Sequence, residues 1–164
     1  MTGVGKPSGV DAVRPVIGKL RSIGLEGEAE LQALLKLIKL KGGVSRGKDI
    51  IDAGTSPTRL TVLLDGIACS YERREDGSRQ IYAFQHPGDF CDLYRYVLPE
   101  PTGAVAVAAL TDCSVGTICC KDLEQALEQY PKLGLALWRC TMLEASISRE
   151  RLLHVSRRPA PRSR

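Results

Sequence analysis

The sequence lacks any apolar run of the ~18 residues that a helix needs to cross a bilayer. Its first residues, MTGVGKPSGVDAVRPV, lack the uninterrupted apolar core of a signal peptide. We therefore expect a cytoplasmic protein without membrane contact. The length of 164 residues suits one domain with a hydrophobic core of its own.

Patterns of metal ligands are also missing. The chain has only two histidines, which share no motif, and its six cysteines form no C-x-x-C pair. The cysteines lie in mostly apolar surroundings, at Cys69, Cys91, Cys113, Cys119, Cys120 and Cys140. We expect reduced, mostly buried thiols and no bound metal. The alternatives are redox sensing or metal ligation at Cys91 and metal or haem ligation at His86.

Catalytic motifs are absent as well. The sequence holds no GxSxG, no phosphate-binding loop, no H-E-x-x-H and no readable pair of nucleophile and base. Jelly-roll enzymes that hold catalytic metals need several histidines, and this chain has two. We therefore expect that the protein is not an enzyme and carries no cofactor.

Positive charge is concentrated at the C-terminal end. The formal net charge is +4, but residues 149–164 hold six arginines and a single acid, a local charge of +5. The basic character therefore belongs to the end of the chain, where residues 157–164 are expected to form a basic tail. It does not indicate a DNA-binding face on the body of the protein.

The N-terminal part is expected to hold a loose segment and one helix. Residues 1–15 are rich in Gly, Pro and Ser and predict a flexible lead-in. From Glu26 the apolar residues fall at helical spacing, at Leu31, Leu34, Leu35 and Ile38. The KGG that follows Leu40 is expected to end this helix.

The middle of the chain reads as a series of short strands. They are DIIDAG, RLTVLLDG, IACSYERR, RQIYAF, GAVAVAAL and CSVGTIC, separated by turn residues. Asp76-Gly77 lies between the third and fourth of these runs and predicts a β-hairpin. Frequent short strands favour a β-sandwich, jelly roll or barrel over a parallel sheet.

The C-terminal part is expected to be helical. CKDLEQALEQYP predicts a short helix that is capped at Lys121-Asp122 and ended or bent at Pro131. Residues 132–156 predict a long helix whose apolar stripe, widened by Cys140, needs a partner. That partner is either the β body or the same helix of a second subunit. The expected dimer interface is Leu135, Trp138, Met142, Leu143, Ala145 and Ile147.

This order of elements resembles the sensory half of Crp/Fnr-type bacterial transcription regulators. The resemblance covers roughly residues 20–158 and rests on VSRGKDIIDAG and LTVLLDGIACSYERREDGSRQIYAFQHPGDF. It implies a mainly β fold with flanking helices, a double-stranded β-helix (jelly roll) of the cyclic-nucleotide-binding-like type over residues 16–131. It also implies a homodimer joined by the long C-terminal dimerisation helix.

The resemblance also implies an effector pocket, although its usual contacts are replaced. In cyclic-nucleotide-binding members a glycine–glutamate pair follows the Gly-Asp-Phe turn, and an arginine with a small hydroxylic neighbour holds the phosphate. Ungapped counting places Asp92-Leu93 and Gly103-Ala104 at these positions. We therefore do not expect cAMP as the effector. The pocket candidates are Gly88, Asp89, Phe90, Cys91, Asp92, Leu93, Arg95, Gly103, Ala104 and Val105.

Several readings of these residues stay open. Asp89 and Asp92 are expected to cap turns, with cation or effector binding as the alternative. The small-residue run GAVAVAAL is expected to be a buried strand, and alternatively lines an apolar effector cavity.

Regulators of this type continue into a helix-turn-helix domain, for which only eight residues remain after Ser156. We therefore expect an effector domain without its own DNA-binding domain, so that this chain alone does not bind DNA directly. It would act as a homodimer, or by pairing with a full-length regulator. The alternatives are a stand-alone module that regulates a protein partner and a non-functional truncated product.

Overall fold

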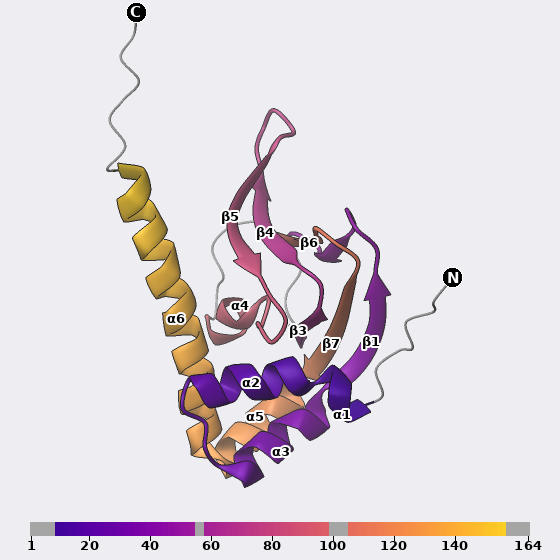
Figure 1. Cartoon of the computed structure of the whole chain (residues 1–164), viewed down its shortest axis with the longest axis vertical. Coiled ribbons are helices and arrows are strands. Elements are labelled where there is room, and N and C mark those ends of the chain that lie inside the picture. Colours follow the sequence, from indigo (N-terminus) through magenta and orange to yellow (C-terminus); the bar gives the residue numbers. More distant parts are fainter. Residues whose placement is uncertain (1–8, 55–57, 99–104, 157–164) are drawn as a thin grey trace, which may run out of the picture.

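The computed structural model describes residues 9–54, 58–98 and 105–156, and these form two antiparallel sheets with helices at one end and along one side (Figure 1). The first sheet has the strand order β1-β7-β3, with β1 at Lys39–Val44, β7 at Cys113–Cys119 and β3 at Arg59–Asp65. The second has the order β2-β6-β4-β5, with β2 at Asp49–Ile51, β6 at Ala106–Ala109, β4 at Ala68–Arg73 and β5 at Arg79–Gln85.

Six helices flank the sheets in the described part of the chain. They are α1 (Gly9–Ala12), α2 (Arg14–Ser22), α3 (Glu28–Leu37), α4 (Leu93–Val97), α5 (Cys120–Gln129) and α6 (Pro131–Ser156). The predicted class, mainly β with flanking helices and a long C-terminal helix, is confirmed. No helix in the described ranges combines the length and the hydropathy that spanning a bilayer requires.

Strand β3 shows how one strand serves two cores. Every residue from Leu60 to Leu64 is buried, so neither face of the strand meets solvent. Leu60, Val62 and Leu64 belong to a large core together with apolar side chains of α2, α3, α5 and α6. Leu63 points to the other face, into a smaller core between the two sheets with Val107 and Val115. The period of two along a strand produces this division.

The hairpin between β4 and β5 forms where the sequence predicts it. Arg73 pairs with Arg79 at its base, and Gly77 adopts a φ of +82°, which glycine tolerates because it has no Cβ. The amide of Ser78 donates a hydrogen bond to Asp76 Oδ1 at 2.8 Å. Asp76-Gly77 therefore sets the turn, as predicted.

The expectation of a loose lead-in is wrong for residues 9–15, which lie in α1 and α2 or between them. Val13, Val16 and Leu20 are buried at helical spacing in the large core, so this segment packs instead of fraying. Residues 1–8 and the expected tail 157–164 lie outside the described residues.

Two helix ends differ from prediction. The helix expected to run on to Leu40 ends at Leu37, and the KGG segment lies in β1, where Gly42 has a φ of +104°. Helix α5 begins at Cys120 with no side-chain cap, so no cap forms at Lys121-Asp122. The short helix ends at Gln129, before Pro131, as predicted, and Pro131 is the first residue of α6, a position where its missing N–H costs no hydrogen bond.

Candidate functional site

A cavity of about 450 Å³ lies between β5, α4 and α6. Strand β5 contributes Tyr82, Phe84 and Gln85 to its wall, and α4 contributes Tyr94. Helix α6 closes the other side with residues that include Thr141, Glu144, Ala145, Ile147, Ser148 and Arg151. The cavity therefore joins the β-roll to the second half of the long helix.

The predicted pocket residues take three different places. Cys91 and Val105 line the cavity. Phe90 and Leu93 are buried in the large core, with exposed fractions of 2% and 0%, and therefore support the wall from behind. Gly103 and Ala104 lie outside the described residues.

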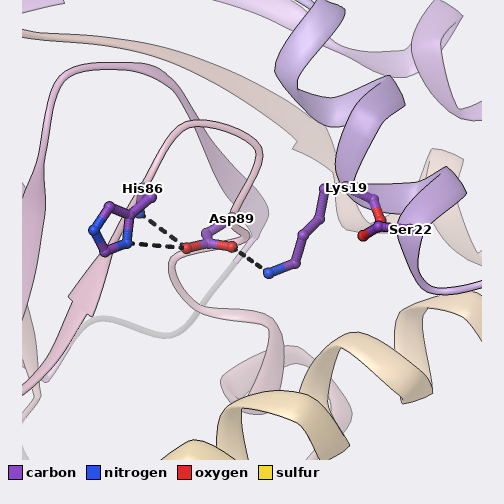
Figure 2. Close-up of polar contacts among 4 residues, drawn as sticks. All are labelled: Lys19, Ser22, His86 and Asp89. Atoms are coloured by element: carbon purple, nitrogen blue, oxygen red, sulfur yellow. Dashed lines mark hydrogen bonds and ion pairs between the residues drawn. The ribbon is translucent and has the colours of Figure 1, made fainter.

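The turn that holds Gly88 and Asp89 is clamped against α2 (Figure 2). Lys19 Nζ donates to Asp89 Oδ1 at 2.6 Å, and the amide of His86 donates to Asp89 Oδ2 at 2.9 Å. Gly88 has a φ of +97°, and a Cβ at this position would lie 2.5 Å from the carbonyl oxygen of Pro15. Only glycine fits between the turn and α2, and Asp89 satisfies the turn amide and the lysine together.

The same helix α2 is braced from within. The hydroxyl of Ser22 donates to the carbonyl oxygen of Lys19 at 2.7 Å, one turn along the helix (Figure 2). Lys19 and Asp89 are both mostly buried, with side-chain exposures of 23% and 15%. Their ion pair therefore ties the N-terminal helix to the entrance of the cavity in a partly desolvated setting.

Asp92 and Arg95 are buried and are not among the residues that line the cavity. Asp92 is buried, and its Oδ1 accepts a hydrogen bond from the amide of Thr61 at 2.8 Å, which joins the start of α4 to β3. Burial raises the pKa of Asp92 to about 6, although the Thr61 amide and the charge of Arg95 oppose this shift. Asp92 makes no side-chain cap on α4, so its contact is with the sheet.

The thiol of Cys91 is shielded from solvent. Burial raises the pKa of this thiol well above its usual value, so the group stays protonated and is a weak nucleophile. No cluster of three or more His, Cys, Asp or Glu side chains suited to a metal ion occurs within residues 9–54, 58–98 and 105–156.

A buried polar group at the back of the cavity was not predicted. Gln85 Nε2 donates to Ser70 Oγ at 2.7 Å, and both side chains are more than nine-tenths buried. Gln85 Oε1 accepts no hydrogen bond from the described part of the chain. Burial, followed by the neighbouring Tyr94 hydroxyl, raises the pKa of Tyr82, so these hydroxyls stay protonated. In the sequence, only the aromatic residues Tyr82 and Phe84, two positions apart in β5, indicate that this strand borders a cavity.

The cavity wall on α6 carries one carboxyl group that was also missed. Burial, followed by the nearby charge of Asp89, raises the pKa of Glu144 to about 7, and the charge of Lys19 opposes this shift. The apolar stripe of this helix does not include Glu144, which lies one turn beyond the buried Cys140. Its spacing from Cys140 would have placed it on the body-facing side.

The opposite side of α6 is apolar and exposed. Most of the predicted interface side chains are between 38% and 60% exposed in the single chain: Leu135, Trp138, Met142, Leu143 and Ile147. Ala145 is exposed too, although it and Ile147 also border the cavity. Cys140 faces the body and is buried.

The chain is similar to known proteins in sequence and in fold. The family model described as "Cyclic nucleotide-binding domain" matches residues 43–130 of this chain. The transcriptional activator protein FnrL of Cereibacter sphaeroides is 28% identical over 143 residues, which are 85% of this chain and 55% of FnrL. The chain therefore spans about half the length of this curated relative.

Two solved structures are similar in fold. A cyclic nucleotide-binding domain from Methylobacillus flagellatus has a TM-score of 0.69 at 16% identity, covering 89% of this chain and 85% of that one. FixK2 from Bradyrhizobium japonicum has a TM-score of 0.64 at 25% identity, covering 75% of this chain and 60% of that one. The predicted Crp/Fnr resemblance and the jelly-roll fold of the cyclic-nucleotide-binding type are confirmed.

Proposed function

The chain belongs to the cyclic nucleotide-binding domain family, and we propose that it is the effector-sensing part of a Crp/Fnr-type transcription regulator. The cavity carries this proposal, because one of its walls is the β-roll and the other is α6. The helix that closes the cavity also presents an unpaired apolar face to solvent. A ligand in the cavity therefore contacts the helix through which two subunits would meet.

Self-association through α6 is the second part of the proposal. Leu135, Trp138 and Met142 follow one another at steps of three and four residues, the spacing of a coiled-coil seam. Their exposed fractions of 43% to 60% are large for apolar side chains that lie next to one another on one helix. A parallel pair of α6 helices would cover this stripe.

The proposed mechanism is a population shift. A ligand that bridges β5 and α6 binds best when the second half of α6 lies against the sheet, so it favours that arrangement by the difference in its affinities. In a dimer, the same movement changes how the two helices meet. The sensory signal is therefore the angle between the second half of α6 and the β-roll.

The effector we propose is not a cyclic nucleotide. Leu93, at the position where the resemblance expects the ribose-binding glutamate, is fully buried in the core and does not line the cavity. The cavity wall instead carries the carboxyl group of Glu144, which would repel a cyclic phosphate when ionised. We expect no thermal stabilisation by cAMP or cGMP at about 1 mM.

Hydrogen exchange tests the sensory function. Compounds from a metabolite collection that raise the melting temperature are expected to protect β5 and residues 141–151, and to change the emission of Trp138, the single tryptophan of the chain. Stabilising compounds that protect only the turn at residues 74–78, and leave β5, residues 141–151 and the emission of Trp138 unchanged, would contradict the proposal. Stabilisation by cAMP with protection of β5 would instead overturn only the choice of effector.

A further inference from the structure

We propose that the cavity selects a small, planar aromatic or heteroaromatic ligand that donates hydrogen bonds and is cationic or neutral, such as an aryl amidine, amine or amide. This inference rests on the proposed function, because it treats the same cavity as the ligand site. It adds the chemical class of the ligand. Three features of the wall carry it: a buried acceptor, an excess of negative charge and aromatic side chains.

The buried acceptor is Gln85 Oε1. The side chain is 6% exposed, and its amide nitrogen is already engaged with Ser70 Oγ at 2.7 Å. The oxygen accepts nothing from the described residues and is itself covered by neighbouring atoms, while Gln85 is one of the residues that border the cavity. Leaving a buried acceptor unpaired costs about 1–3 kcal/mol, so a ligand N–H that meets this oxygen after a turn of the Gln85 side chain recovers much of that free energy.

The excess of negative charge comes from Glu144. Lys19 is engaged with Asp89 in a 2.6 Å ion pair, and Glu144 makes no ion pair with the described residues, although the charge of Lys19 still acts on it. Glu144 is mostly buried and borders the cavity. A cationic donor placed there would complete a charge-assisted hydrogen bond, whereas a carboxylate or phosphate would add a second negative charge.

The positive groups at the cavity do not reverse this preference. Arg151 lies 5.7 Å from the ring centre of Phe84 and is exposed, so solvent screens its charge. The side chain of His86 is 65% exposed, and its Nδ1 lies 4.0 Å from Asp89, which would compensate the imidazole if it were protonated. Neither group offers a buried cation to an anionic ligand.

Aromatic side chains set the shape of the ligand. Tyr82, Phe84 and Tyr94 border the same cavity, and the lining is mainly apolar. Flat rings pack against such walls with offset or edge-to-face contacts, and each contact contributes about 0.5–1.5 kcal/mol beyond the burial of area. A planar ring that carries a donor group at one end matches the aromatic wall and the polar back together.

Three probes of nearly identical shape separate the alternatives: benzamidine, which is cationic, benzamide, which is neutral, and benzoate, which is anionic. Each is titrated into the ¹⁵N-labelled protein, and dissociation constants are fitted to the amide shifts of β5 and of residues 141–151. We expect benzamidine to bind tightest, benzamide to bind more weakly and benzoate to bind weakest. Benzoate that binds as tightly as benzamidine would overturn the inference.

Two substitutions assign the preference to its residues. Glu144→Gln is expected to weaken benzamidine about tenfold and to leave benzamide within about threefold, since only the charge-assisted contact is lost. Gln85→Met is expected to weaken both probes about fivefold, because both donate to the same oxygen. The controls are Glu128→Gln and Gln129→Met on the exposed surface of α5, which should change neither constant.

The outcomes also separate this inference from the sensory function. Benzoate binding in the cavity, with shifts along residues 141–151, would support the sensor and overturn the donor preference. Benzamidine binding that is unchanged in both Glu144→Gln and Gln85→Met would overturn the inference, because neither proposed contact would then contribute to the affinity. No response to any probe at about 10 mM, a range where weak fragments still bind, would also overturn it. The hydrogen-exchange experiment would still decide the sensory function.

Discussion

The two halves of α6 are held by different means. Residues 131–140 bury four side chains in the large core, at Leu133, Ala136, Leu137 and Cys140. Residues 141–154 bury none to the same degree, and several of them border the cavity. The first half is thus fixed by the core, and under the proposed function the position of the second half is expected to depend on what the cavity contains.

The change occurs along a single face of the helix. Leu133, Leu137 and Cys140 follow one another at steps of four and three residues on the side that faces the body, and Glu144 comes one turn later. Ser148 continues the same side and also borders the cavity. Where the sequence changes from apolar to polar on this face, the packed core ends and the cavity begins.

The largest expected effect comes from truncating the first half. Leu133→Ala should lower the free energy of unfolding by about 2–5 kcal/mol, because Leu133 is fully buried and the change leaves a cavity. Leu152→Ala removes the same atoms from a side chain that is 71% exposed. This variant should change the free energy of unfolding by about 0.5 kcal/mol or less. Urea denaturation measures both variants, in a Trp138→Glu background that removes any dimer contribution. Equal losses would contradict the proposed difference between the halves.

The exposed face gives the next largest effect. Trp138→Glu places a charge at the centre of the proposed seam and should weaken self-association about 30-fold or more, as expected for a central aromatic anchor. Sedimentation equilibrium measures the association constant. The matched control is Leu40→Glu, an exposed position on β1. Strand β1 lies on the other side of the molecule from α6 (Figure 1). If Leu40→Glu dissociates the dimer and Trp138→Glu does not, subunits meet elsewhere.

Glu144 makes the second half sensitive to pH. Its pKa is about 7 when folded and 4.5 ordinarily, so the folded state binds more protons between these values and stability falls as pH rises. The free energy of unfolding of Glu144→Gln, relative to that of the wild type, should therefore be about 1–3 kcal/mol higher at pH 8 than at pH 4.5. Asp92, with a raised pKa of about 6, contributes in the same direction to both proteins and cancels in the comparison. Denaturation at the two pH values measures the gain, which should be absent in Glu128→Gln.

Much of the fold could be predicted because local patterns carried it. Asp76-Gly77 fixes a hairpin within a few residues, and the strands on either side of it pair antiparallel from Ala68–Gln85 to Arg73–Arg79. The first helices were missed because Gly, Pro and Ser near the N-terminus suggested disorder. Their order depends on distant contacts, such as Val16 in the large core and Lys19 on Asp89. Composition alone does not report such tertiary contacts.

The site was predicted less well, for a related reason. The resemblance directed attention to the segment after Gly88, but Phe90 and Leu93 of that segment are core residues. The polar wall comes from β5 and α6, which are far apart in sequence. Gln85 and Glu144 meet at one cavity through the packing of the helix on the sheet, and neither belongs to a local motif.

The smallest effect concerns the seam within the second half. Steps of three and four residues from Leu135 through Met142 lead on to Arg149 and then Leu152, so one charged residue interrupts the apolar series. In a parallel pair the two Arg149 side chains would approach one another, and their repulsion would loosen this half while the first half stays packed. Arg149→Leu should therefore tighten self-association about three- to tenfold by sedimentation equilibrium. It should also reduce the change in Trp138 emission on ligand binding, because a firmly paired second half moves less. A weaker dimer in Arg149→Leu would indicate that Arg149 makes an attractive contact between the subunits. It would contradict the proposal that the second half of α6 is the more loosely paired half.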